Sequence, residues 1–290
     1  MTAIPGVRGT VWRRVRTGSW AAPLAGLVMG AVLVFALLAP VLAPAGYEAI
    51  DLRARLQPPL LLGGTPTHPL GTDELGRDVL ARLAYSIRFT VVIALAATIL
   101  GAVFGTTIGL LAAHTRGWID DGLMLLVDFQ ASLPYLILVL AMIAAFGTNL
   151  VLFVILLGLH GWQQYARLAR GQALSVQAQG FVIAVRALGA TPARLYLRHV
   201  LPNIAAVLIV NATLAFPQTI LLESSLSFLG LGVQPPQTSL GNMVGFGRGY
   251  LMTAWWIAAA PAATIFLTSL AFSILGDRLR DHLDPTLRGG

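Results

Sequence analysis

The chain has 290 residues, of which 57% are hydrophobic and 11% charged, with a net charge of +7. A soluble domain carries about 25% charged residues, so most of this chain is expected to be surrounded by lipid. The chain contains neither cysteine nor lysine. Their absence excludes disulfides, cysteine-ligated metals, Schiff-base chemistry and a lysine-dependent phosphate loop. The positive charge fits orientation in a membrane, and no nucleic-acid partner is expected.

Apolar runs without charged residues predict an all-α, polytopic membrane protein, because about 20 apolar residues cross the hydrocarbon core as a helix. The runs cover residues 17–47, 89–113 and 129–166, the stretch between Arg198 and Glu223, and the stretch between Arg248 and Asp277. The third run is long enough for two helices, with a tight turn at Gly147, Thr148 and Asn149 in its middle. The sequence therefore predicts six transmembrane helices, and the first is interpreted as a retained helix rather than a cleaved signal peptide.

The arginines set the expected orientation, because positively charged segments stay in the cytoplasm. Arginines without neighbouring acids occur in the amino-terminal tail and between the fourth and fifth spans: Arg8, Arg13, Arg14, Arg16, Arg167, Arg170, Arg186, Arg194 and Arg198. Both termini are therefore expected in the cytoplasm. The predicted units are a cytoplasmic tail (1–20), a first span (21–46), an extracytoplasmic loop (47–87), a core of five spans (88–276) with a cytoplasmic loop (171–203), and a cytoplasmic tail (277–290).

The segment 180–203 is polar and lies between apolar stretches. Four of its apolar residues recur at helical spacing and predict one apolar face: Phe181, Ala184, Val185 and Leu188. Gly189 suits the end of that helix, where a positive φ is favoured. Thr191 and Pro192 are typical of the first turn of a second helix. This helix–glycine–helix elbow is predicted to dock into a partner.

Two sets of residues leave alternatives open. Arg194 and Arg198 are four residues apart on the second arm of the elbow, where like charges weaken a helix. They either orient the chain or pair with acidic groups of a cytoplasmic partner. A stripe of small residues on the second span packs either within the chain or against a second membrane subunit: Gly101, Gly105 and Gly109.

No catalytic motif and no metal-ligand spacing is found, so a non-catalytic protein without a metal site is expected. His160 stands alone and is interpreted as a satisfied interfacial histidine. Glu223 lies near the outer end of the fifth span, where an acid is costly unless it faces water or a partner. It either lines a pathway or caps a short outer helix. The candidate lining residues of such a pathway are Asn211, Gln218, Glu223, Ser224 and Ser225.

The elbow resembles the coupling loop of importer permeases in the ATP-binding-cassette (ABC) superfamily. That pattern has a Glu-Ala-Ala triplet before a glycine and a Leu-Pro pair further along. Here residues 183–185, Ile-Ala-Val, stand in the triplet, Gly189 is the glycine, and Leu201-Pro202 closes the pattern. The glutamate and the second alanine of the pattern are absent.

Three further blocks narrow the resemblance: HPLGTDELGRDVLARL (68–83), LSFLGLGVQPP (226–236) and GDRLRDHLDP (276–285). Together with the elbow they are similar, in the same order, to the signatures of the C-type permease subunit of oligopeptide and dipeptide importers. The same family includes nickel, glutathione and haem systems. Four ordered blocks that are spread over the chain from His68 onward are far more specific than any single motif.

The resemblance implies a type I ABC importer permease in a bacterial cell membrane, forming half of a translocation pathway. Its expected partners are a homologous B-type permease, two cytoplasmic ATP-binding subunits and an extracytoplasmic substrate-binding lipoprotein. ATP and magnesium are expected on the ATPases, and no cofactor on this chain. Nickel, glutathione or haem are alternative cargos, and an ATP-independent channel or carrier is the alternative from another class.

The resemblance also assigns roles to residues. The residues expected to couple the chain to an ATPase are Phe181, Ala184, Val185, Arg186, Ala187, Leu188, Gly189, Ala190, Thr191, Pro192, Arg194 and Arg198. In the extracytoplasmic loop, Asp73, Arg77 and Asp78 are expected to form a lid or a seat for the binding protein. The alternative for this loop is structural packing against the partner permease.

Overall fold

The computed structural model describes residues 20–42 and 46–283. These residues are mostly helical, with an isolated antiparallel β-bridge between Thr72 and Asp78. The prediction of an all-α chain is therefore confirmed for this part of the sequence. The predicted tail 1–20 lies almost entirely outside the described residues, as do residues 43–45 of the predicted first span and residues 284–290 of the second tail.

The elements follow one another with few long connections. In chain order they are α1 (Ala21–Leu37), α2 (Ala39–Leu42), the 3₁₀ turns η1 (Leu52–Ala54) and η2 (Leu60–Leu62), α3 (Val79–Thr115), α4 (Gly117–Ser132), α5 (Tyr135–Phe146), α6 (Leu150–Gln177), α7 (Gly180–Ala187), α8 (Pro192–Leu195), the π-helical turn η3 (Tyr196–Val200), α9 (Leu201–Phe228), α10 (Leu240–Gly247), the 3₁₀ turn η4 (Arg248–Tyr250) and α11 (Trp256–Leu283).

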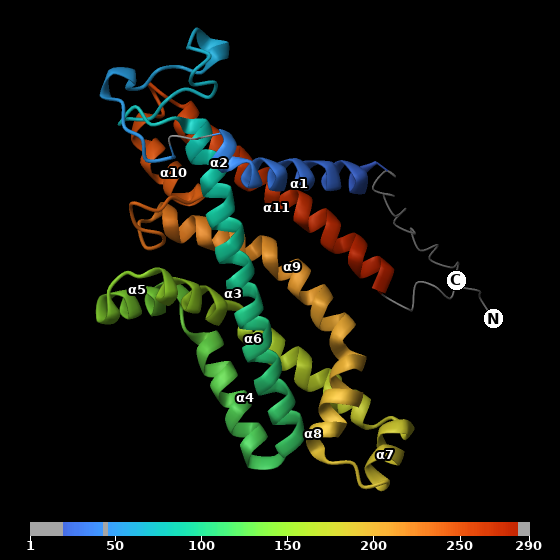
Figure 1. The fold of residues 1–290 in the computed structure, drawn as a ribbon. Coiled ribbons are helices and arrows are strands. Elements are labelled where there is room, and N and C mark those ends of the chain that lie inside the picture. The colour runs from blue at the N-terminus through green and yellow to red at the C-terminus, as the bar shows by residue number, and fades with distance from the viewer. Residues whose placement is uncertain (1–19, 43–45, 284–290) are drawn as a thin grey trace, which may run out of the picture.

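The long helix α3 organises the molecule (Figure 1). One of its ends meets the segment 46–78 and α10, and its other end lies near α7 and α8. Helices α6 and α9 both pack against α3, and α11 packs against α9, α10 and α1. The segment 46–78 and the elbow are therefore at opposite ends of the bundle, as expected if they lie on opposite sides of a membrane.

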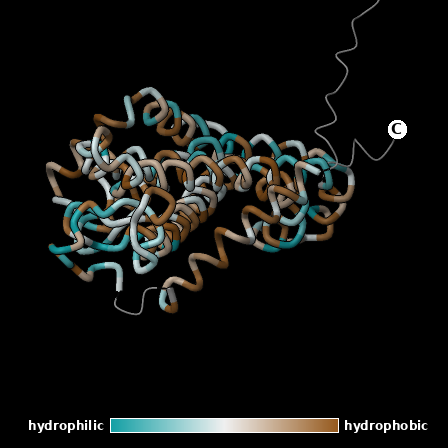
Figure 2. Tube along the Cα trace, turned by 90° about the horizontal axis from the view of Figure 1, so that it is seen from above, coloured by the Kyte–Doolittle hydropathy of each residue, from teal (hydrophilic) through white to brown (hydrophobic). Residues whose placement is uncertain are grey.

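Within the described ranges, three helices are long and apolar enough to cross a membrane: Val79–Thr115, Pro192–Phe228 and Trp256–His282. The pair α4 and α5, bent by 92°, forms a fourth if it counts as one broken span. Helix α1 is apolar but has only 17 residues. In Figure 2 it is the largely hydrophobic part of the tube next to the grey break. The predicted number of six spans is therefore not confirmed by length and composition.

Two helix boundaries differ from the ends of the apolar runs. The second span was expected from residue 89, but α3 begins at Val79 because the Asp78 carboxylate accepts the backbone N–H groups of Leu80 and Ala81. The run 129–166 breaks at the expected turn, where Gly147 has a φ of +75° and Asn149 caps α6. It also breaks at Leu133, which is extended because it precedes a proline.

The glycine stripe of α3 packs within the chain. A Cβ atom on Gly101, Gly105 or Gly109 would lie 2.6, 2.2 or 2.3 Å from the carbonyl oxygens of Gly158, Trp162 and Ala166, respectively. Since all three carbonyls belong to α6, the backbones of α3 and α6 touch along this stripe. The structure therefore supports the first of the two alternatives, packing inside one subunit.

A methyl group at this contact is expected to separate the two helices. Gly105→Ala should destabilise the protein by about 1–3 kcal/mol, the usual cost of overpacking, and lower its melting temperature in detergent. Gly122→Ala on α4 is the matched control, because nothing lies within 4 Å of its Cβ position and alanine is the better helix former. An equal melting temperature for both variants would contradict the close contact.

Candidate functional site

The first arm of the elbow, helix α7, ends as its sequence predicts. Gly189 has a φ of +81°, and it donates its N–H to the Arg186 carbonyl while Ala190 donates to the Val185 carbonyl. This pair of bonds is the Schellman arrangement, in which a left-handed glycine satisfies the last carbonyls of a helix. Because Gly189 has open space around its Cβ position, its requirement for glycine is set by the backbone alone.

The second arm also begins as predicted. The Thr191 hydroxyl accepts the Arg194 N–H, and Pro192 occupies the first turn of α8. Helix α8 then passes through the π-helical turn η3 directly into α9. The elbow therefore connects two long helices, α6 on one side and α9 on the other.

The buried side of the elbow differs from the predicted face. Val182 is fully buried and Leu195 is 3% exposed, and both pack with Val176 in one apolar cluster. Val185 is only partly buried against this cluster. A helix of eight residues is too short for its periodicity to fix which side faces the core, so the connection to α6 decides it.

The exposed side of the elbow is apolar. Leu188 is 87% exposed, Ile183 57% and Phe181 42%. Ala184 and Ala187 are exposed beside them. Ile183 was not among the predicted contact residues, although its apolar side chain in the middle of a polar segment could have indicated it. Exposed apolar side chains in a group mark a site of interaction with another protein or a membrane.

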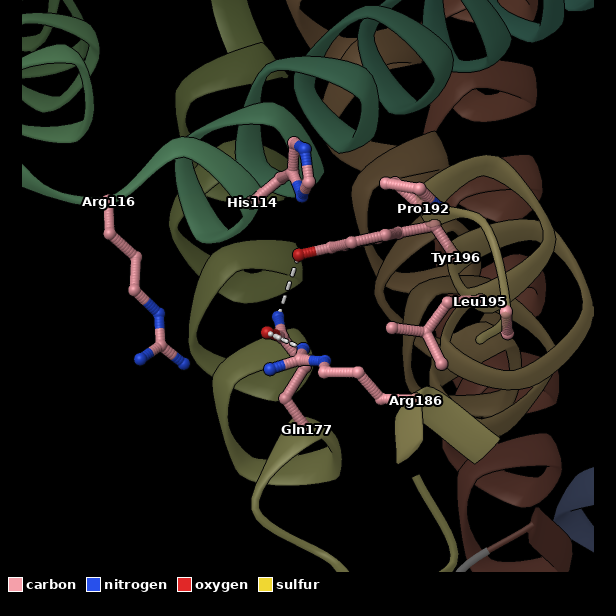
Figure 3. A pocket seen from close by; sticks show the side chains of 8 residues that line it. His114, Arg116, Gln177, Arg186, Pro192, Leu195 and Tyr196 are labelled. Carbon is pink, nitrogen blue, oxygen red and sulfur yellow. Dashed lines mark hydrogen bonds between the residues drawn. The ribbon is translucent and has the colours of Figure 1, made fainter. Parts of the chain in front are cut away.

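A cleft of about 310 Å³ lies between the elbow and the ends of α3 and α6 (Figure 3). The side-chain amide of Gln177 donates its Nε2 hydrogen to the Tyr196 hydroxyl at 2.8 Å, and its Oε1 atom accepts a hydrogen bond from Arg186 at 3.3 Å. The His114 ring meets the Tyr196 ring edge to face at 5.3 Å. This network connects α7 and η3 of the elbow to the ends of α6 and α3.

The cleft is positively charged. Arg116 and Arg186 line it, and no acid is among the lining residues in the described part of the chain. The acid on the first turn of α4, Asp120, is already bound by Arg170 through two bonds of 2.6 and 2.7 Å. Figure 3 shows Arg116 apart from the Gln177 network, and its side chain is exposed. An acidic group of a partner is the chemistry that fits this cleft.

The candidate pathway residues on α9 do not share one environment. Glu223 is 0% exposed and accepts the Ser227 hydroxyl at 2.8 Å and the Ser224 hydroxyl at 3.3 Å. Ser225 is exposed and bonds to the Leu221 carbonyl. In this conformation Glu223 and Ser224 therefore line no open path. Glu223 does not cap the outer helix either, because Ser239 is the N-cap of α10.

The other two candidates lie nearer the middle of α9. Gln218 is exposed and borders a small cavity between α3, α6 and α9. Asn211 is half-buried, and its amide nitrogen has no hydrogen-bond partner among the described residues. His160, interpreted as an interfacial histidine, packs its ring against Tyr135 with centroids 4.3 Å apart.

Asp73 holds the segment 46–78 together from inside. It is 0% exposed, and its carboxylate binds Arg82 of α3 and accepts Arg77 Nε at 2.7 Å. It also accepts the backbone N–H groups of Leu75 and Arg77. The expectation that Asp73 contacts the binding protein is therefore corrected: a fully buried side chain offers no surface to a partner. Arg77 and Asp78 are half-buried, and their role as a seat or lid stays a prediction.

Removal of Asp73 is expected to leave the 3%-exposed Arg82 without its counter-charge. Asp73→Ala should cost about 3–5 kcal/mol, as for other broken buried ion pairs, and lower the melting temperature in detergent. The control is Asp51→Ala in the same loop, because the exposed Asp51 carboxylate accepts the Arg53 N–H and forms no ion pair with another described residue. If the two variants lose the same stability, the ion network does not hold the loop.

Comparisons with known proteins agree with this arrangement. Residues 105–289 match the family described as the binding-protein-dependent transport system inner membrane component. The di/tripeptide transport system permease protein DppC of Pseudomonas aeruginosa (strain UCBPP-PA14) is 40% identical over 91% of this chain and 88% of its own length. The oligopeptide transport system permease protein OppC of Mycobacterium tuberculosis (strain ATCC 25618 / H37Rv) is 35% identical over 99% of this chain and 98% of its own.

A solved structure shares the fold. Inward-facing conformations of the MetNI methionine ABC transporter match with a TM-score of 0.57 and 21% identity, over 70% of this chain and 96% of that one. The helical bundle thus has a counterpart of known architecture. With the family match over residues 105–289 and the relatives aligned over nearly its whole length, the chain belongs to the family of binding-protein-dependent transport system inner membrane components.

Proposed function

We propose that this chain is the permease subunit of an ATP-driven importer of short peptides. Its relatives, at 35% to 40% identity, are transport system permease proteins for di/tripeptides and oligopeptides. The observation that carries the proposal is the elbow, which presents Leu188 at 87% exposure on a chain that belongs to a family of transport components.

The elbow is the contact point with a cytoplasmic ATPase. Its exposed apolar side chains provide a dry contact, and the basic cleft beside it receives an acidic group of the ATPase. The remaining coupling residues, Arg194 and Arg198, are exposed on the second arm and set the register of docking. ATP and magnesium bind to the ATPases, so this chain performs no catalysis.

The elbow transmits the movement of the ATPases because it connects two long helices. A transporter needs two states that its ligands bind with different affinity. Closure of the ATPase pair on ATP moves the elbow, and α6 and α9 move with it because Val182 and Leu195 are anchored in the same cluster as both helices. A homologous B-type permease supplies the other half of the pathway.

The membrane arrangement has six spans and cytoplasmic termini. The tails 1–20 and 277–290 and the loop 171–203 lie in the cytoplasm, and the loop 47–87 meets the substrate-binding protein outside the cell. The separation of the elbow from the segment 46–78 along α3 supports this arrangement (Figure 1). The bacterial cell membrane is the expected location.

Changes in the elbow are expected to abolish uptake without loss of insertion. Leu188→Asp places a charge in the dry contact, and Gly189→Val forces a β-branched residue to a φ of +81°, at a cost of at least about 1–2 kcal/mol. ATP-dependent peptide uptake and copurification of the ATPase should both be lost at unchanged membrane abundance. Gly171→Val on α6 is the control, since its Cβ position is open and its φ is not positive.

Two other outcomes would contradict the proposed function. Normal uptake by both elbow variants would exclude the docking role. Peptide movement through the purified wild-type chain without any ATPase would instead place the protein among channels or carriers.

The basic cleft has its own test. Arg116→Glu reverses one charge of the cleft, so the ATPase should dissociate at a lower salt concentration during copurification, because the partner's acid is then repelled. Arg53→Glu makes the same charge change on an exposed residue of the outer loop and should leave retention of the ATPase unchanged. Identical salt profiles for Arg116→Glu and the wild type would remove the cleft from the interface.

A further inference from the structure

Three polar side chains converge at one place between α6 and α9. Gln164 and His160 lie one helical turn apart on α6, and Gln218 lies opposite on α9. All three are exposed and border a single cavity of about 40 Å³. Neither glutamine side chain makes a hydrogen bond to another described residue.

Lipid is an unsuitable neighbour for these amides. Gln218 belongs to the stretch Pro192–Phe228, which is apolar enough to cross a membrane. An amide group that faces hydrocarbon without a hydrogen bond costs several kcal/mol. The lipid-facing side of the bundle looks different: on α3, Val92, Ile99 and Val103 are 58%, 53% and 61% exposed and are all aliphatic. The glutamine side must therefore face water or a polar molecule.

We propose that Gln164, Gln218 and His160 form a contact point for the backbone amides of a peptide in the translocation pathway. This inference rests on the proposed function and names the surface on which the cargo is held. The residues match this ligand because a glutamine amide both donates and accepts hydrogen bonds, as a peptide group does. No arginine, aspartate or glutamate borders the cavity, so the contact does not select for cargo side chains of one charge.

The size of the cavity defines how the cargo is held. The cavity of about 40 Å³ has room for only a few water molecules. A peptide therefore passes across the mouth of the cavity and exchanges hydrogen bonds with the rim. Behind the rim, Thr98 of α3 donates to Thr219 of α9 at 3.3 Å, which closes the cavity on the inner side.

The contact point is also connected to the elbow. Gln164 and His160 lie on the helix that leads into α7, and Gln218 lies on the helix that continues from α8. A movement of the elbow therefore displaces both sides of the contact point. The same movement that the ATPases drive would shift the residues that hold the peptide backbone.

Cysteine labelling tests this directly, because the chain contains no cysteine of its own. Gln164→Cys and Gln218→Cys are to be assembled with the partner permease and ATPases and exposed to a charged, water-soluble thiosulfonate reagent. Both should be labelled, and trialanine with the binding protein and ATP should slow the labelling. Ile99→Cys, on the aliphatic side of α3, is the control and should not react.

Uptake provides the second measurement. Gln164→Leu and Gln218→Leu should each reduce trialanine uptake about tenfold, the equivalent of one lost hydrogen bond of about 1.4 kcal/mol, at unchanged membrane abundance. Gln218→Asn, which keeps the amide, should show more uptake than Gln218→Leu and less than the wild type.

The outcomes separate this inference from the function on which it rests. Wild-type protein that takes up no peptide with ATP would overturn the proposed function. Wild-type protein that imports trialanine, while Gln164→Cys and Gln218→Cys remain unlabelled, would show that the partner permease covers these residues and would overturn the contact point. Unreduced uptake in both leucine variants would overturn it as well.

Discussion

The backbone contact between α3 and α6 is the constraint on which the other features depend. Glycines at three successive turns of α3 meet carbonyl oxygens of α6, so the two helices touch without side chains between them. This contact fixes the end of α6 beside the end of α3, where Gln177 also reaches the Ala113 carbonyl at 3.4 Å. The elbow begins three residues later at Gly180, and its position follows from the helix pair.

The two ends of the bundle use different interactions. At the end that carries the segment 46–78, buried polar groups hold the chain: Asp73 binds Arg82 of α3, and Trp256 of α11 donates to the Thr72 carbonyl at 3.3 Å. At the elbow, most buried contacts are apolar, and the arginines are left exposed. The segment 46–78 therefore keeps its shape through its own internal contacts, whereas the elbow leaves an apolar surface exposed.

The two short helices of the elbow and the turn between them were predictable from sequence because they depend on local interactions. A glycine with positive φ after a short apolar helix, followed by a threonine cap and a proline, depends only on neighbours within a few residues. The turn at 147–149 was predictable for the same reason, since Gly147 and Asn149 act within their own turn. The break at Leu133 had a local signal too, the following proline, which the length of the apolar run concealed.

The sequence by itself determined which segments are helical, where the tight turns fall and that lipid surrounds much of the chain, because composition and turn chemistry act over short distances. Only the tertiary structure decided that the glycine stripe faces α6, that Asp73 is an internal counter-charge, and that Val182 is buried while Ile183 is exposed. It also brought Gln164 and Gln218 to one cavity. Each of these depends on which distant helix lies opposite, and periodicity within one helix carries no information about that neighbour.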